Sequence, residues 1–226
     1  MANVKKDLLE KGAILQRDRE TYAIAPHIAG GICDPNTLRK LADVADKYHV
    51  AAIKITGAQR IALVGLREED LDKAWKDLGI KPGAAVGMCV RSIKVCPGTT
   101  FCKRGLQDSV GLGLALDAAY HGMAMPSKLK IGVSGCPNSC GESWVKDLGF
   151  LGSPKGFKCI VGGDAGRTPR VGRVLAEELD IDRAKALAEK VLKYYQTNGK
   201  SGERIGPFID RIGWDKFKGD VLGNPR

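Results

Sequence analysis

Hydrophobic positions in residues 12–80 alternate between β-prone runs and helical spacing. Three apolar runs predict strands: TYAIA (21–25), AAIKI (51–55) and RIALV (60–64). Between the first two runs, apolar residues recur at helical spacing from Leu38 to Tyr48, after an Asp34-Pro35 pair that is typical of a helix start. A second apolar stripe, from Leu71 to Leu78, predicts a helix that ends at Gly79. The pattern predicts a compact β-α-β-β-α module.

The pattern changes after Lys81-Pro82-Gly83, which reads as a linker, so we expect domains at 1–80 and 81–226. The second part is rich in glycine and contains most of the cysteines. We expect helices at about 103–120, 180–195 and 203–212, and strands at 129–133 and 157–163. Strands and helices in this mixture predict an α+β fold.

Charge limits the classes of partner. The net charge of +10 predicts an anionic partner or cofactor, but Lys and Arg are dispersed and aromatic residues make up only 6%, so we expect no nucleic acid. The most apolar stretch, 110–125, is interrupted by Asp117 and His121, and the N-terminal segment lacks the apolar run of a secretory signal. We therefore expect a cytoplasmic protein that does not enter a membrane.

Four of the seven cysteines form two close pairs. Cys96 and Cys102 enclose Pro-Gly-Thr-Thr-Phe, and Cys136 and Cys140 enclose Pro-Asn-Ser. We expect each pair to lie in a proline-led loop that runs into a helix start, where free N–H groups stabilise negatively charged iron-bound thiolates. The spacing favours a [4Fe–4S] cluster.

Other interpretations of these cysteines stay open at this point. Zinc also binds four cysteines, although its ligand pairs usually enclose two residues. A disulfide scaffold does not suit a cytoplasmic chain of this size, and proline-flanked pairs are a poor match for ordinary core positions. The isolated Cys33, Cys89 and Cys159 are expected to be small core residues.

The cysteine segments VRSIKVCPGTTFC (90–102) and GCPNSCGESWVKDLGFLG (135–152) resemble those of the siroheme-dependent sulfite and nitrite reductases. Three other segments also resemble this family: ITGAQRIALVGL (55–66), VGGDAGRTPRVGR (161–173) and GERIGPFIDRIG (202–213). The resemblance implies a ferredoxin-like half-domain, followed by a mixed α/β domain that binds siroheme and the cluster.

The resemblance also assigns residues. Cys96, Cys102, Cys136 and Cys140 match the cluster ligands, and Cys140 matches the cysteine that bridges the cluster to the siroheme iron. Four cations match positions around the substrate: Arg60, Arg91, Lys128 and Lys130. Alternation along a strand puts Lys128 and Lys130 on one face. Three further residues match contacts to the carboxylates of the macrocycle: Asn138, Arg170 and Arg173.

The implied activity is the six-electron reduction of a small oxyanion, sulfite to sulfide or nitrite to ammonia. Nothing in the chain resembles a flavin or nicotinamide domain, so an external donor, such as a ferredoxin-like protein, is expected. Larger family members contain two copies of this unit and this chain has one, so a homo-oligomer is a hypothesis. Two alternatives are an electron-transfer or sensor protein that keeps the cluster without catalytic siroheme, and a zinc-stabilised binding module.

Overall fold

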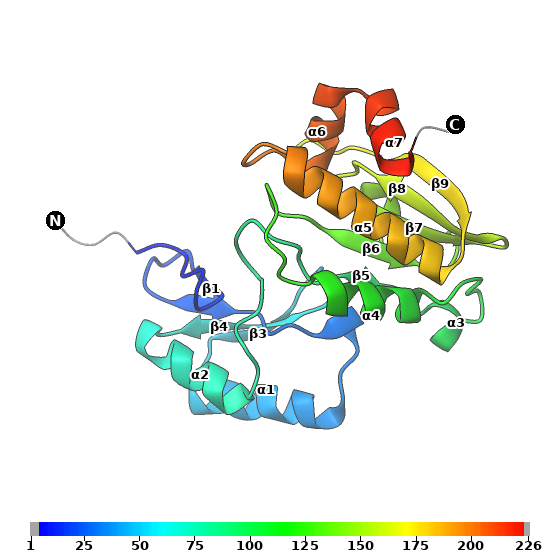
Figure 1. Ribbon diagram of the computed structural model, residues 1–226. Helices are drawn as coiled ribbons and strands as arrows, with labels where there is room; N and C mark the ends of the chain where they lie inside the picture. Colours follow the sequence, from blue (N-terminus) through cyan, green and yellow to red (C-terminus); the bar gives the residue numbers. More distant parts are fainter. Residues whose placement is uncertain (1–4, 224–226) are drawn as a thin grey trace. The chain divides into compact units, whose positions relative to one another are not determined.

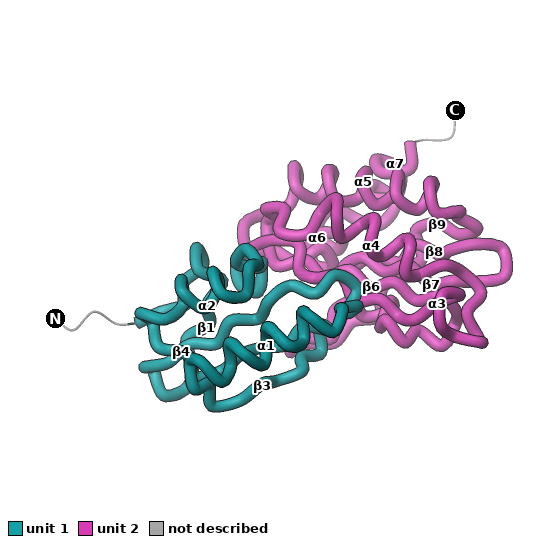
Figure 2. The backbone as a smooth tube through the Cα atoms, turned by 90° about the horizontal axis from the view of Figure 1, so that it is seen from below, with its two compact units in different colours: residues 1–87 teal, residues 88–226 magenta. Residues whose placement is uncertain are grey.

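The computed structural model describes residues 5–223 and divides into two compact units, residues 1–87 and 88–226 (Figure 2). The division lies seven residues after the boundary that the linker Lys81-Pro82-Gly83 suggested. Each unit has its own hydrophobic core, and the two are described separately.

The first unit is a four-stranded antiparallel sheet with two helices. Its strands are β1 (Ala13–Leu15), β2 (Tyr22–Ile24), β3 (Ala52–Ile55) and β4 (Ile61–Leu66), in the order β1-β2-β4-β3. Its helices are α1 (Pro35–Lys47) and α2 (Leu71–Leu78), with single 3₁₀ turns at Ala29–Gly31 and Glu68–Asp70. The expected β-α-β-β-α order is confirmed, and β1 is an additional strand.

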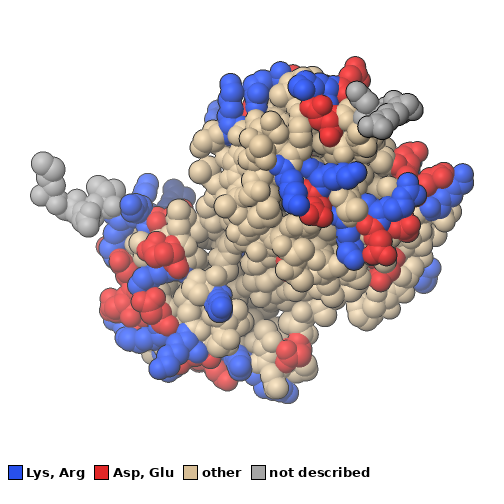
Figure 3. All heavy atoms as spheres, in the orientation of Figure 1, with Lys and Arg blue, Asp and Glu red and all other residues tan. Residues whose placement is uncertain are grey.

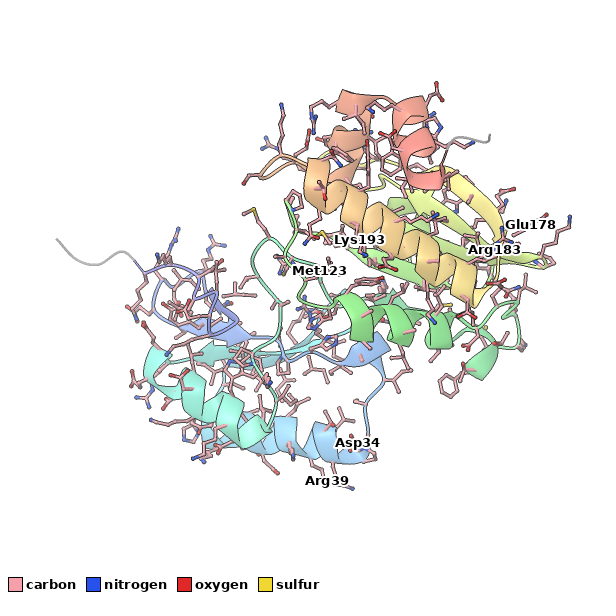
Figure 4. All side chains as sticks on the ribbon, viewed as in Figure 1. Asp34, Arg39, Met123, Glu178, Arg183 and Lys193 are labelled. Atoms are coloured by element: carbon pink, nitrogen blue, oxygen red, sulfur yellow. The ribbon has the colours of Figure 1, made fainter. Side chains whose placement is uncertain are left out.

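Helix α1 begins where the sequence predicted. The Asp34 carboxylate accepts hydrogen bonds from the backbone N–H of Asn36 (2.7 Å) and Thr37 (3.1 Å), and Figure 4 labels Asp34 at this end of the helix. Leu41 and Val44 enter the core as expected, but Leu38 is 48% exposed, so the buried stripe is narrower than the apolar pattern suggested.

The second unit contains a five-stranded sheet. Its strands are β5 (Lys94–Val95), β6 (Ile131–Ser134), β7 (Leu148–Ser153), β8 (Gly156–Val161) and β9 (Arg173–Leu179), in that order across the sheet. Its helices are α3 (Gly98–Phe101), α4 (Ser109–Tyr120), α5 (Ile181–Asn198), α6 (Ile205–Ile212) and α7 (Trp214–Leu222), with a 3₁₀ turn, η3, at Ser143–Val145. Strands β5, β6 and β7 are parallel, whereas β8 and β9 are antiparallel to their neighbours.

Helices α4 and α5 pack against each other and against the strands of this sheet (Figure 1). The predicted inward face of α5 is confirmed, because Leu187, Val191 and Tyr195 are all buried. The prediction of a helix from residue 103 is wrong: α4 begins at Ser109, where Asp108 caps it by accepting a hydrogen bond from Gly111 N–H (2.8 Å). Strands β7 and β9 and helix α7 were not predicted.

Charged side chains of both signs are interspersed on the face that Figure 3 shows. Several cations of the second unit have carboxylate partners, including Lys158 with Glu177 (2.6 Å) and Arg170 with Asp210. The high net charge is therefore not concentrated in one large basic patch on that face.

Candidate functional site: two cysteine loops at one sheet edge

Both cysteine pairs follow the carboxyl ends of neighbouring parallel strands. Cys96 comes directly after β5, and Cys136 comes two residues after the end of β6. The two strands pair in parallel, with Val95 opposite Val133. Parallel strands present their carboxyl ends at the same edge of a sheet, so loops 40 residues apart in sequence emerge side by side.

Backbone hydrogen bonds then tie the two loops together. The carbonyl of Gly135 accepts bonds from the N–H groups of Leu106 (2.8 Å) and Gln107 (2.9 Å), just beyond Cys102. Gly135 itself donates its N–H to the Cys96 sulfur at 3.1 Å. The approach leaves no room for a side chain, because a Cβ on Gly135 would lie 2.7 Å from the Gly98 Cα. The convergence of the loops therefore depends on glycine at this position.

The four sulfur atoms differ in exposure. Cys96 is buried, Cys102 and Cys136 are intermediate, and Cys140 is exposed. Besides the Gly135 N–H, Cys96 has the Ser109 hydroxyl 3.3 Å from its sulfur. Hydrogen bonds to sulfur stabilise a thiolate and tune the potential of an iron–sulfur cluster. The exposure of the four cysteines therefore increases from the buried Cys96 to the exposed Cys140.

The arrangement does not gather the cysteines around a single ion. Within residues 5–223, no three Cys, His, Asp or Glu side chains lie close enough to hold one metal ion. Zinc would need all its thiolates within about 2.3 Å of one point. A [4Fe–4S] cluster meets each thiolate through a different iron and accepts a wider spacing. The Gly135 N–H that donates to the Cys96 sulfur fits an iron-bound thiolate.

The helix starts expected beside these loops are only partly present. Helix α3 is a four-residue turn that lies between Cys96 and Cys102, and the chain after Cys140 enters the short 3₁₀ turn η3 instead of an α-helix. The expectation of a helix start after each pair is therefore wrong. Individual N–H groups, such as that of Gly135, are the donors that this structure offers instead.

The chain after Cys140 folds back over β6. Gly141 donates its N–H to the Ser134 hydroxyl (2.9 Å), which lies 2.8 Å from the Ser143 hydroxyl. A Cβ on Gly132 would lie 2.5 Å from the Gly141 carbonyl, which shows how closely this segment covers the strand. The return segment therefore lies against Gly132 and Ser134 of β6.

A network of ion pairs joins a residue that precedes the first cysteine pair to residues that follow the second pair. Glu142 pairs with Lys94 of β5 (2.5 Å) and with Lys146 (2.7 Å). Burial alone would raise the pKa of Glu142, but hydrogen bonds from Lys146 and Lys94 outweigh it and lower the pKa to about 2. Glu142 is therefore ionised at neutral pH and holds two lysines beside the cysteine loops.

Lys130 lies in a cationic environment. Burial lowers its pKa, and the positive charges of Lys146, Arg204 and Lys128 lower it further. Its backbone N–H donates to the buried Asp147 carboxylate (2.7 Å). Lys128 and Lys130 alternate in burial as predicted, with Leu129 buried between them, although both precede the first residue of β6.

Asp147 is the buried anion that organises this region. It is 1% exposed and accepts two hydrogen bonds from Arg204, to Oδ1 (2.8 Å) and Oδ2 (2.7 Å). Arg204 also reaches Asp164 at 3.1 Å. These hydrogen bonds hold Arg204, the residue before α6, against Asp147, the residue before β7. Asp147 also positions the backbone of Lys130.

The other predicted residues have diverse surroundings. Arg60 is 8% exposed and follows the turn between β3 and β4 in the first unit. Its backbone N–H donates to the Thr56 hydroxyl. Arg91 lies just before β5, and burial lowers its pKa. Asn138 is exposed in the second cysteine loop. The four predicted cations are thus divided between the units.

Arg170 and Arg173 both have partners within the second unit. Arg170 forms a bidentate pair with Asp210 (2.5 and 2.8 Å), and Arg173 stacks on the Trp214 ring at 4.1 Å. Arg170 also lines a pocket of about 560 Å³ together with Lys128 and Arg204. Arg170 and Arg173 also line a second, smaller pocket together with Asp210.

Sequence reasoning missed five residues of this region: Lys94, Glu142, Lys146, Asp147 and Arg204. Charged residues close to the cysteine motifs were the available signal, since Lys94 and Glu142 each lie two residues outside a cysteine pair. Arg204 lies 57 residues from Asp147, and no local pattern predicts that pairing.

Comparison with known proteins agrees with this geometry. Residues 86–225 match the family model described as "Nitrite and sulphite reductase 4Fe-4S domain", and residues 14–79 match the "Nitrite/Sulfite reductase ferredoxin-like half domain". The chain belongs to the nitrite and sulfite reductase family. The expected family, fold class and iron–sulfur domain are thereby confirmed.

Relatives within this family differ in length. The chain is 46% identical over 213 residues to an assimilatory-type sulfite reductase of Nitratidesulfovibrio vulgaris, and the match covers 94% of this chain and 98% of that protein. It is 39% identical to a nitrite reductase [NAD(P)H] of Bacillus subtilis, with 94% of this chain but only 26% of that protein covered. The chain thus spans nearly all of one curated relative and about a quarter of the other.

Solved structures of the family share the fold. A dissimilatory sulfite reductase I matches with a TM-score of 0.80 at 17% identity, covering 91% of this chain and 72% of that chain. The NirA protein of Mycobacterium tuberculosis matches with a TM-score of 0.78 at 18% identity, covering 91% and 41%. No helix among residues 5–223 has the length and apolar character needed to span a membrane.

Proposed function

We propose that this family member reduces sulfite to sulfide with six electrons; siroheme and a [4Fe–4S] cluster would supply the redox chemistry, and Cys140 would be the cysteine that serves both. The observation that carries the proposal is the meeting of two cysteine loops at one sheet edge, with a backbone N–H aimed at a cysteine sulfur. The nearly full-length match to a protein named as a sulfite reductase favours sulfite over nitrite.

In this proposal Cys96, Cys102, Cys136 and Cys140 hold the cluster. The buried Cys96 would keep its side of the cluster away from water, and the Gly135 N–H would stabilise the charge on its sulfur. Cys140 is the exposed member of the set, which suits a thiolate that faces a second cofactor. Siroheme would supply the iron that binds the substrate, and the cluster would relay single electrons.

The cations are proposed to bind the oxyanion and to deliver protons. Lys130 is the strongest candidate for proton donation, because its lowered pKa makes the ammonium a better acid than an ordinary lysine. Lys128, Arg60 and Arg91 would neutralise the oxyanion, with Arg91 remaining charged despite its burial. Asp147 holds the Lys130 backbone in place by accepting its N–H.

The carboxylates of siroheme need cationic partners of their own. We assign that role to Arg170 and Arg173, with Asn138 as a neutral hydrogen-bonding group in the second cysteine loop. The pocket that Arg170 shares with Lys128 and Arg204 supports this proposal, because it presents guanidinium and ammonium groups to one space.

Electrons are proposed to come from an external ferredoxin-like donor, and two copies of the chain are proposed to associate. Sedimentation of the cofactor-loaded protein tests the association: a dimer mass is expected, and a purely monomeric protein would refute it.

An absorption spectrum of anaerobically purified protein tests the cofactors. We expect cluster absorption together with chlorin-like bands; cluster bands alone would favour an electron-transfer or sensor protein, and a colourless zinc protein would favour a binding module. Assays with reduced methyl viologen and either sulfite or nitrite then test the activity. A holoenzyme that turns over neither oxyanion refutes the proposal.

The role of Lys130 is tested by Lys130→Ala, with Lys158→Ala as the control because Lys158 is a lysine of β8 in an exposed ion pair. Lys130→Ala is expected to keep the cofactor spectrum and lose most of the turnover, whereas Lys158→Ala keeps both. Normal turnover in Lys130→Ala would show that this ammonium takes no part.

A further inference from the structure

The loop around Cys102 presents an unusual exposed surface. Phe101 is 71% exposed and Leu106 is 43% exposed. Two exposed cations, Lys103 and Arg104, follow Cys102 in the same segment. We call these four residues the Phe101–Leu106 surface. Large exposed apolar side chains bordered by charge are typical of protein-binding sites.

Backbone hydrogen bonds hold this surface in place. Cys102 donates to the Gly98 carbonyl (2.9 Å), Gly105 donates to the Cys102 carbonyl (2.9 Å), and Leu106 donates to the Gly135 carbonyl (2.8 Å). Phe101 and Leu106 thus project from a backbone that is tied to both cysteine loops. A preorganised apolar surface loses less conformational entropy on binding, which favours association.

The two cations of the surface are available to a partner. Lys103 and Arg104 form no ion pair with any carboxylate in residues 5–223, in contrast to Lys158 and Arg170 of the same unit. An acidic partner would satisfy both charges. A second copy of the chain would bring an identical pair of cations to a symmetric contact, and the two pairs would repel each other.

We propose that an acidic protein carrying one-electron redox centres docks on the Phe101–Leu106 surface and passes electrons to the cluster beside Cys102. The location rests on the proposed function, because Cys102 is one of the proposed cluster ligands and is adjacent to both Phe101 and Lys103 in sequence. Each contact oxidises the donor by one electron and reduces the cluster by one, and six such transfers supply one oxyanion.

The test separates the docking site from the chemistry. The double variant Lys103→Glu/Arg104→Glu and the single variant Phe101→Ala are assayed with two electron donors: a reduced acidic bacterial ferredoxin and reduced methyl viologen. Viologen is a small cation that needs no protein docking surface. The matched control is Lys190→Glu/Lys218→Glu, which reverses two exposed lysines of α5 and α7 that also form no ion pair within residues 5–223.

We expect the charge-reversal variant to lower kcat/KM for ferredoxin by roughly tenfold or more, mainly through KM, and to weaken the dependence of the wild-type rate on salt. Phe101→Ala is expected to raise KM for ferredoxin without changing the salt dependence. Both variants should keep the cofactor spectrum and the viologen-driven kcat, and the control should match the wild type with both donors.

Three results would overturn the docking site: unchanged ferredoxin kinetics in both variants, an equal loss with ferredoxin and viologen, or the same loss in the control. A wild-type enzyme that works with viologen but never with the ferredoxin would also overturn it. Failure of the proposed function looks different, because the wild-type holoenzyme would then reduce neither sulfite nor nitrite with viologen.

Discussion

Removing the Asp147 carboxylate should destabilise the second unit strongly. Asp147 is 1% exposed, and its partner Arg204 has a side chain that is 13% exposed, so Asp147→Ala leaves a guanidinium in a poorly solvated site. Its remaining carboxylate partner among residues 5–223 is Asp164, at 3.1 Å. The Lys130 N–H also loses its acceptor. Breaking a buried ion pair by removing one partner typically costs about 3–5 kcal/mol.

The cost can be measured by urea unfolding of the holoenzyme, followed by far-UV circular dichroism. For a chain of this size, a loss of about 3–5 kcal/mol corresponds to a fall in Tm of roughly 6 to 20 °C. Arg204→Met should cost a similar amount, because it leaves the buried carboxylate without a cation. The double variant Asp147→Ala/Arg204→Met should cost less than the sum of the single changes, because it leaves neither charge behind.

The control is Glu177→Gln, which breaks the exposed pair with Lys158 (2.6 Å) and should cost only about 0.2–1 kcal/mol. If Asp147→Ala costs no more than this control, or if the single changes are additive in the double variant, then the buried pair does not organise the unit as we argue.

Three further predictions concern the site and its supports. Gly135→Ala places a Cβ 2.7 Å from the Gly98 Cα in the first cysteine loop and should lower the iron content per chain. In the control Gly57→Ala, the new Cβ meets nothing within 4 Å, so the iron content should not change. Equal iron contents in the two variants would contradict the close approach of the loops. Asp108→Ala removes the hydrogen bond that caps α4 and should cost about 1 kcal/mol of unfolding free energy in urea, with Asp108→Asn restoring most of it; no loss in the alanine variant would exclude the cap. The pKa of Lys130 is lowered and its protonated form is the proposed proton donor, so turnover should fall with rising pH at a pH below the pKa of an ordinary lysine. Lys130→Arg should move this fall in turnover to higher pH. An unchanged pH profile in that variant would assign the fall to another group.

Local sequence patterns were sufficient where the decisive interactions are local. Asp34 caps α1 through residues two and three positions away, and the inward face of α5 follows from spacing within one helix. The four cysteines could be selected because two proline-led pairs are distinctive as sequence. The expected helix start near residue 103 was wrong, because the backbone of Leu106 and Gln107 is bound to Gly135 of the other cysteine loop and α4 begins only at Ser109.

The sequence by itself determined the type of site: thiols in two spaced pairs, cations near them and a reductase family that uses both. Only the tertiary structure decided how the parts meet. The parallel pairing of β5 with β6 brings loops 40 residues apart to one edge, and the Asp147–Arg204 pair joins residues 57 positions apart. The tertiary structure also decided that Phe101, beside Cys102, is exposed. Large apolar residues are often buried, and no local sequence pattern predicts that Phe101 is exposed. Contacts between distant segments depend on how the whole core packs, and that information is not contained in any short stretch of the chain.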